Sequence, residues 1–212
     1  MCSGRVDLEF VLRAFSNGTD GVFIGGCRLN ECNYITHGNY DSLSNVLLCK
    51  KIMEYIGLNP ERLRIEFMSS GDGNLLAEVI NDFCKKVKEI GPLGKIEGID
   101  GKKLKFKLEA VTKLIPYVKL VERERLRVPF KSEEEYNKFF TSDEVNRLIN
   151  ELILDKLAIS QILSLLREKP LSTGEMSAIL GLNPSEVSRH MNSSSRHGLV
   201  RFDESRKSYA LA

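Results

Sequence analysis

Residues 170–202 read PLSTGEMSAILGLNPSEVSRHMNSSSRHGLVRF, a run in which helix caps and turn residues separate short apolar periods. Ser172 or Thr173 is placed to cap a first helix, and Gly181 opens the turn that follows it. Pro184 suits the first position of a second helix, because its fixed φ is already helical. The run therefore predicts two short helices joined by a tight turn.

The segments on either side of this run complete a small domain. Upstream, apolar residues recur at helical spacing from Asp143 to Lys169, which predicts one long helix. Downstream, Gly198 ends the second short helix, and two short strand-like segments flank a turn at residues 203–205. Three helices followed by a hairpin are typical of a winged helix, which we expect at about residues 143–212.

The N-terminal part alternates between helix and strand patterns. Apolar residues at helical spacing predict helices that begin near Leu8, Leu43 and Leu76, the first of them capped by Asp7. Short apolar runs predict buried strands at residues 21–26 and 63–68. Alternation of this kind favours an α/β fold with a parallel sheet and crossover helices.

A sheet of two strands is thin for three helices. The first helix has no strand in front of it, because only a handful of residues precede it. Three explanations stay open: the chain borrows sheet from a partner, sequence upstream of Met1 is absent, or residues Met1–Val6 pair as a stub strand. We expect an α/β fold with a small parallel sheet, Rossmann- or flavodoxin-like and lacking its first strand, followed by the winged helix.

The charge distribution suggests three parts along the chain. They are a cysteine-bearing α/β domain at residues 1–94, a basic helical connector at 95–142 and the winged helix at 143–212. The connector carries 12 Lys and Arg against 8 Asp and Glu, whereas the winged helix has 9 of each. Within the connector, Pro116 should end or kink a helix. Ser132 is placed to open a further short helix.

The overall composition is that of an ordinary globular protein. A formal net charge of +2 over 212 residues does not by itself require a polyanionic partner. No apolar run approaches the roughly 20 residues of a membrane span, and the N-terminus is not a signal peptide. We therefore expect a cytoplasmic protein with no membrane partner. Its five cysteines should serve metal binding, redox chemistry or packing rather than a disulfide framework.

Three cysteines are candidates for a metal site. Cys27 follows the first expected strand, where ligands bind in open α/β sheets, and Cys32 lies five positions further on. Cys2 precedes the first helix as Cys27 precedes the second. If a strand lies upstream of Cys2, all three thiols would gather at one edge of the sheet. Fe–S clusters take thiolate ligands, commonly four. A pair of unrelated loop cysteines is the plain alternative.

The remaining candidates have plainer interpretations. Cys49 and Cys84 fall on the apolar stripes of two helices, so we expect both in the core. His37 could join a mixed metal site, but the Asn, Thr and Gly residues around it favour an ordinary loop histidine.

The winged helix also offers candidates for DNA binding, because its second short helix can enter a major groove. The candidate contacts are Ser185, Ser188, Arg189 and Asn192 on that helix, and Arg206 and Lys207 in the wing. However, neutralisation of phosphates supplies most non-specific affinity for DNA, and this segment carries no net charge. A neutral unit can bind DNA as a homodimer, or it can dock other proteins, and we favour the second role.

The N-terminal residues resemble a known family. The runs Cys2-Ser3-Gly4-Arg5-Val6-Asp7, Gly21-Val22-Phe23-Ile24-Gly25-Gly26-Cys27 and Cys32-Asn33-Tyr34 resemble the delta (iron–sulfur) subunit of methyl-viologen-reducing hydrogenase. The likeness covers roughly residues 1–94. It implies a 2Fe–2S cluster, with Cys2, Cys27 and Cys32 at the family's cysteine positions. It also implies electron transfer from hydrogenase subunits, or another donor, to the A subunit of heterodisulfide reductase.

The chain departs from that family at its start and continues beyond it at its end. The family has a further cysteine-rich motif before the Cys-Ser-Gly-Arg segment, so we expect the native protein to extend upstream of Met1. The segment from Ile162 to Leu211 is similar to winged helices of bacterial and archaeal regulators, a likeness that is specific for fold and poor for function.

Two functions remain as hypotheses. The favoured one is a non-catalytic electron-transfer subunit of an oxidoreductase complex. The alternative is a redox-responsive regulator in which the N-terminal thiols sense and the winged helix binds DNA. A free-standing enzyme is disfavoured, because the sequence contains no P-loop, no full dinucleotide fingerprint and no nucleophile motif.

Overall fold

The computed structural model describes residues 2–34, 37–128 and 131–212. The chain divides into two compact units, Met1–Arg147 and Leu148–Ala212. Within the described residues, no helix is both long enough and apolar enough to cross a membrane.

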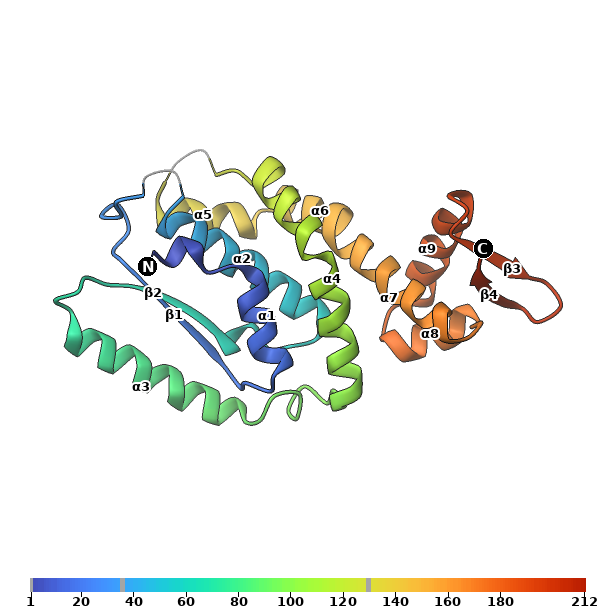
Figure 1. Cartoon of the computed structure of the whole chain (residues 1–212), viewed down its shortest axis with the longest axis horizontal. Coiled ribbons are helices and arrows are strands. Elements are labelled where there is room, and N and C mark those ends of the chain that lie inside the picture. The colour runs from blue at the N-terminus through green and yellow to red at the C-terminus, as the bar shows by residue number, and fades with distance from the viewer. Residues whose placement is uncertain (1, 35–36, 129–130) are drawn as a thin grey trace. The chain divides into compact units, whose positions relative to one another are not determined.

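The first unit begins with alternating helices and strands, as predicted (Figure 1). Their order is α1 (Leu8–Ser16), β1 (Val22–Gly26), α2 (Asn39–Ile56), β2 (Leu63–Phe67) and α3 (Gly73–Ile90). In the described part of the chain β1 and β2 form a two-stranded parallel sheet, with partners running from Val22 and Leu63 to Gly26 and Phe67. The α/β class with a small parallel sheet is therefore confirmed.

The N-terminal segment forms a short helix and not a strand. Ser3–Arg5 is a 3-10 turn, η1, because the amide groups of Arg5 and Val6 donate to the carbonyl oxygens of Cys2 and Ser3. These donors are used within the segment, so the described residues 2–6 do not form a stub strand, while Met1 lies outside the described residues. Asp7 then caps α1, as predicted, by accepting a hydrogen bond from the amide of Glu9 at 3.2 Å.

Helix α2 contributes many buried side chains to the core of this unit, and they settle one of the two cysteine predictions. Cys49 is fully buried on α2, as expected, and burial raises the pKa of its thiol to about 12. Cys84 on α3 is exposed, so the prediction that it lies in the core is wrong. The reason is that α3 buries only Phe83 and Ile90.

Residues 95–142 lie within the first unit. They form α4 (Gly101–Arg125), which contacts α1, and α5 (Glu133–Thr141), which contacts α2. Pro116, expected to end or kink a helix, does not end α4, which continues to Arg125. The buried neighbours Ile115 and Val118 show that tertiary packing holds the helix where proline removes a hydrogen-bond donor.

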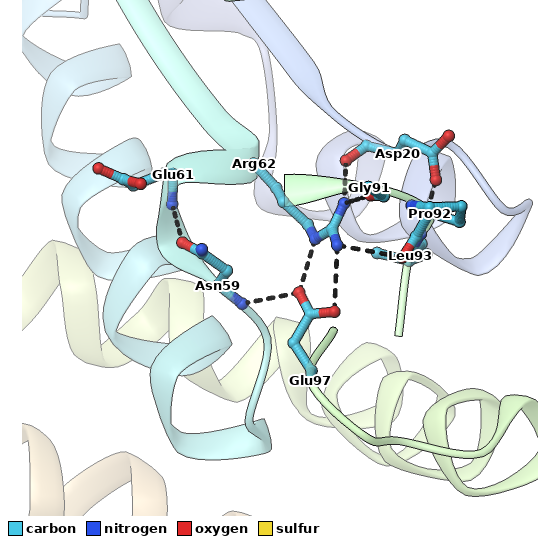
Figure 2. A network of polar contacts seen from close by, with 8 residues as sticks. All are labelled: Asp20, Asn59, Glu61, Arg62, Gly91, Pro92, Leu93 and Glu97. Carbon is cyan, nitrogen blue, oxygen red and sulfur yellow. Dashed lines mark hydrogen bonds and ion pairs between the residues drawn. The ribbon is translucent and has the colours of Figure 1, made fainter. Parts of the chain in front are cut away.

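A buried ion pair joins the loop after α3 to the residue that directly precedes β2 (Figure 2). Arg62 is fully buried, and its guanidinium donates to both carboxylate oxygens of Glu97 at 2.6 and 3.0 Å. It also donates to the carbonyl oxygens of Asp20, Gly91 and Pro92. Burial raises the pKa of Glu97, but these contacts with Arg62 outweigh it and hold the pKa below the usual range. The pair is therefore charged.

The second unit contains the predicted winged helix, although residues 143–147, at the start of the expected range, lie in the first unit. In chain order the elements after α5 are α6 (Asp143–Ile149), a π-helical segment η3 (Asn150–Leu154), α7 (Asp155–Glu168), α8 (Thr173–Leu180), α9 (Pro184–Arg196), β3 (Val200–Asp203) and β4 (Ser208–Leu211). Strands β3 and β4 pair antiparallel as the wing. The predicted long helix from Asp143 to Lys169 is thus helical from Asp143 to Glu168, but a π-helical segment divides it.

Side-chain caps set the bounds of the two short helices, which is why their sequence signals were clear. Ser172 and Glu175 cap α8 reciprocally, and Asn183 and Glu186 do the same for α9. Between the two helices, Gly181 has φ 73°, the left-handed conformation that glycine adopts at little cost.

Candidate functional site

The three candidate cysteines come together at the carboxyl end of β1. Cys27 directly follows that strand, and Cys32 lies on the loop that leads to α2. Cys2 is brought to the same place because η1 packs against α2 and β1. The Sγ atoms of Cys2 and Cys32 lie 3.6 Å apart.

Glycine makes the close approach of these segments possible. A Cβ atom on Gly38 would lie 2.6 Å from the Sγ atom of Cys32, and one on Gly4 would lie 2.8 Å from the carbonyl oxygen of His37. Both distances are too short for a side chain without a shift of the neighbouring atoms. We call the connection between β1 and α2, which carries Cys27 and Cys32, the thiol loop. It can lie against the N-terminal turn η1 only because Gly4 and Gly38 lack side chains.

The surroundings of Cys32 favour its thiolate. The backbone amide of Tyr34 is the largest influence that lowers the pKa of the Cys32 thiol, and the amide of Asn39 adds to it. Asn39 is the first residue of α2, so the thiol lies at a helix N-terminus, where unpaired amides stabilise negative charge.

Cys27 behaves differently, although it is the most exposed of the three. Desolvation of its thiol is the largest influence that raises its pKa, and the neighbouring thiols of Cys32 and Cys2 raise it further. Because the thiols of Cys27 and Cys32 act on each other's pKa, these two groups do not ionise independently. A positive ion beside them would favour the thiolate form of both.

Asn39 organises the thiol loop, a role that no sequence pattern had indicated. Its side-chain amide is buried and donates to the carbonyl oxygens of Cys27 and Arg28 at 2.9 and 2.8 Å. The same nitrogen lies 3.6 Å from the Sγ atom of Cys27. The available signal was an asparagine directly after a glycine at the start of a helix, a position where asparagine often bonds to nearby backbone.

A second contact joins the thiol loop to the loop after β2. The guanidinium of Arg28 pairs with the carboxylate of Asp72 at 2.7 Å, and Asp72 also accepts a hydrogen bond from the amide of Ser69 at 2.8 Å. The carboxyl ends of both strands are therefore linked beside the thiols.

His37 does not join the thiols. Its exposed ring bonds through Nδ1 to the carboxylate of Asp41 at 3.2 Å, which agrees with an ordinary loop histidine. Across the described residues, no group of three or more His, Cys, Asp or Glu side chains already has an arrangement that could hold a metal ion. Binding of a metal by the thiols would need their side chains to turn toward a common centre.

The candidate DNA contacts lie where the sequence placed them in the winged helix. Ser185, Ser188, Arg189 and Asn192 line a hollow of about 670 Å³ on α9, together with Ser193, Arg196 and His197. Within this unit, Arg189 also pairs with Asp155 on α7 at 2.9 Å. Arg206 and Lys207 are exposed in the turn of the wing.

His190 faces the interior of the same unit and has a structural role. It is 5% exposed, and its Nε2 atom lies 3.7 Å from the carboxylate of Asp155. Burial lowers the pKa of His190, and Arg189 lowers it further, while Asp155 acts in the opposite direction.

Comparison with known sequences gives the family of the N-terminal domain. The sequence profile of the methyl-viologen-reducing hydrogenase delta subunit matches residues 1–91, a region that we call the delta domain. The vhu iron-sulfur D subunit of the F420-non-reducing hydrogenase of Methanopyrus kandleri is 37% identical over 92 residues, which are 43% of this chain and 69% of that protein. The chain belongs to the methyl-viologen-reducing hydrogenase delta subunit family.

Two further relatives match the delta domain, one a hydrogenase subunit and one a much longer reductase chain. The iron-sulfur D subunit of the F420-non-reducing hydrogenase of Archaeoglobus profundus is 43% identical over 91 residues, covering 43% of this chain and 66% of that protein. The A subunit of the ferredoxin/F(420)H(2)-dependent CoB-CoM heterodisulfide reductase of Methanosarcina acetivorans is 47% identical over 94 residues, 44% of this chain. The match spans only 12% of that reductase polypeptide.

The C-terminal unit matches a separate family. The profile of the bacterial regulatory protein arsR family covers residues 160–201, which include α8 and α9. This match agrees with the winged-helix fold. The chain therefore combines a delta domain with a regulator-type helix-turn-helix.

Proposed function

We propose that this chain is an electron-transfer subunit whose delta domain carries a 2Fe–2S cluster. It passes electrons from a hydrogenase, or another donor, to the A subunit of a heterodisulfide reductase. The observation that carries the proposal is the gathering of Cys2, Cys27 and Cys32 at one edge of the sheet. The protein is an electron carrier in this account and has no catalytic residues of its own.

The residues at this edge fit an iron–sulfur group as three of its ligands. Thiolates are the usual ligands of such clusters, and hydrogen bonds to sulfur tune their potential. The amides of Tyr34 and Asn39 act on Cys32, and the side chain of Asn39 reaches Cys27. Four ligands are the common number, so a fourth must come from outside these three cysteines.

The names of the relatives support the proposed partners. One set of relatives is named as the iron-sulfur D subunit of a hydrogenase, and another as the A subunit of a heterodisulfide reductase. A domain that occurs both in a separate polypeptide and within a longer reductase chain is suited to work beside that reductase. We propose that the delta domain of the present chain makes the same association. All five cysteines are free thiols, which fits a reducing, cytoplasmic location.

Reoxidation by the partner tests this function. The chain is reconstituted with iron and sulfide under anaerobic conditions, reduced, and mixed with the purified A subunit of heterodisulfide reductase. We expect the visible absorbance of the oxidised cluster to return as electrons leave. Cys27→Ser should abolish the signal, whereas Cys84→Ser, which removes an exposed thiol on α3, should keep it. A chain that binds iron but is never reoxidised by the partner would refute the proposed transfer.

One observation favours a second function, DNA binding by the winged helix. The hollow on α9 is lined by Arg189, Arg196 and His197 together with serine and asparagine side chains, with no carboxylate among its lining residues. Such a surface suits phosphate and base edges although the segment as a whole is neutral. Homodimer formation would double this surface.

Salt-dependent binding to mixed DNA fragments separates this function from protein docking. Binding that falls steeply with salt and weakens in Arg189→Ala would support DNA recognition. Arg13→Ala, which alters an exposed arginine on α1, is the matched control. No measurable binding at low salt would leave the winged helix as a docking module.

A further inference from the structure

Cys2 and Cys32 are placed to form a bond with each other. Their Sγ atoms are 3.6 Å apart, and a disulfide needs about 2.05 Å, so the two sulfur atoms need only a small further approach. Cys2 is held in place by its carbonyl oxygen, which accepts the amide hydrogen of Arg5 at 3.0 Å. Both residues are partly accessible, so neither thiol is sealed in the core.

A cavity opens beside one of the two thiols. It has a volume of about 280 Å³ and is lined by Cys32 together with Asn30, Tyr34 and Tyr40, among others. The hydroxyl of Tyr40 donates to the side chain of Asn30 at 2.9 Å, which fixes that wall. The cavity is of a size for a small organic molecule and not for a folded partner. Cys2 and Cys27 are not among the residues that line it.

We propose that Cys32 and Cys2 form a redox-active dithiol that exchanges with small organic disulfides in the metal-free chain. The sulfur of Cys32 attacks one sulfur of a disulfide RSSR in the cavity, the S–S bond of RSSR breaks, and one RSH leaves. The sulfur of Cys2 then attacks Cys32 in the mixed disulfide and releases the second RSH. Two protein thiols are oxidised to one disulfide, and RSSR is reduced to two RSH.

The assignment of roles follows from the positions of the two thiols. Cys32 borders the cavity and therefore meets the small disulfide first. Cys2 lies against Cys32 on another segment and therefore resolves the intermediate. Cys27 takes no part in the dithiol, whereas the proposed cluster requires all three thiols, so a change at Cys27 separates the two proposals.

Mass spectrometry of the full-length, metal-free chain tests the proposal with 2-hydroxyethyl disulfide as the probe. Trypsin places Cys2, Cys27 and Cys32 on three different peptides, spanning residues 1–5, 14–28 and 29–50. We expect a linked pair of the first and third peptides, formed at least about tenfold faster in the folded chain than in the urea-unfolded chain, because the fold holds the thiols together. Fragmentation assigns the bond to Cys32 and not to Cys49 on the same peptide.

Single variants separate the two steps. Cys2→Ser should accumulate the mixed disulfide on Cys32, because the resolving thiol is gone. Cys32→Ser should form neither species, and the control Cys84→Ser should behave as the parent. Absence of the linked peptides, linkage of Cys27 to Cys32 in their place, or equal rates in folded and unfolded chains would each overturn the proposal.

Iron binding and disulfide formation, measured in the parent chain and in Cys27→Ser, show which of the two proposals fails. The Cys27→Ser variant should lose iron binding but keep the Cys2–Cys32 disulfide. A parent chain that binds iron but forms no disulfide refutes only the dithiol. A parent chain that forms the disulfide but never binds iron refutes only the cluster.

Discussion

The thiols of Cys2 and Cys32 are thirty positions apart in the sequence, and their Sγ atoms lie 3.6 Å apart in the fold. This proximity depends on the packing of the N-terminal turn η1 against α2. It also depends on Gly38, whose missing side chain leaves room for the thiol of Cys32. Because the contact joins two distant segments, it is sensitive to changes that leave every cysteine in place.

A methyl group at Gly38 should separate the thiols. The added Cβ of Gly38→Ala would lie 2.6 Å from the Sγ atom of Cys32, so the loop must move. We expect a loss of about 1–3 kcal/mol in stability and weaker iron binding. Gly71→Ala is the control, because nothing lies within 4 Å of its Cβ position. Equal iron content in the two variants would argue against tight packing at this site.

The side chain of Asn39 should be needed to hold the thiol loop. Asn39→Ala leaves the carbonyl oxygens of Cys27 and Arg28 without their donor. We expect a cost of about 1–3 kcal/mol and faster alkylation of Cys27 in the metal-free chain. Asn74→Ala alters an exposed asparagine in α3 and should change neither quantity. Unchanged alkylation in Asn39→Ala would show that the loop has another anchor.

Glu97 should be essential for the stability of the first unit. Glu97→Gln leaves the fully buried guanidinium of Arg62 without its counter-charge (Figure 2). Breaking a buried pair in this way costs roughly 3–5 kcal/mol, which urea unfolding followed by circular dichroism can measure. The exposed Glu78→Gln is the control. A loss below about 1 kcal/mol, the range of surface pairs, would contradict the role assigned to this pair.

Acidification should destabilise the winged helix through His190. Burial holds the pKa of this histidine below its usual value, so the unfolded chain takes up a proton first as the pH falls. Stability is therefore complete above about pH 6.5 and declines below it. His190→Gln should flatten this decline in thermal unfolding of the winged-helix unit, whereas the exposed His197→Gln should not. A parent protein equally stable on both sides of that pH would contradict the assignment.

Much of this fold could be predicted from the sequence because its local signals agree with its tertiary structure. In the winged helix, the helix ends are set by residues that act on the neighbouring backbone, namely Ser172, Gly181, Asn183 and Pro184. Such local effects can be recognised from a short stretch of sequence. The parallel sheet followed from the alternation of helix and strand patterns, which the crossover connection requires.

The sequence predictions were wrong where packing between distant segments determines the local structure or the burial of a residue. Pro116 lies within α4 because buried neighbours hold the helix, and Cys84 is exposed because only part of the apolar stripe of α3 is covered. The role of Asn39 could not be deduced either, since its acceptors lie eleven and twelve positions away on another segment. Periodicity shows which side of a helix is apolar, but not whether another element covers it.

The most direct test of the account is the iron content and visible absorbance of the chain after anaerobic reconstitution, with a small thiol present to fill a fourth ligand position. We expect about two irons per chain, lost in Cys27→Ser and kept in Cys84→Ser. An iron content in the parent no higher than in Cys27→Ser would contradict a cluster held by Cys2, Cys27 and Cys32.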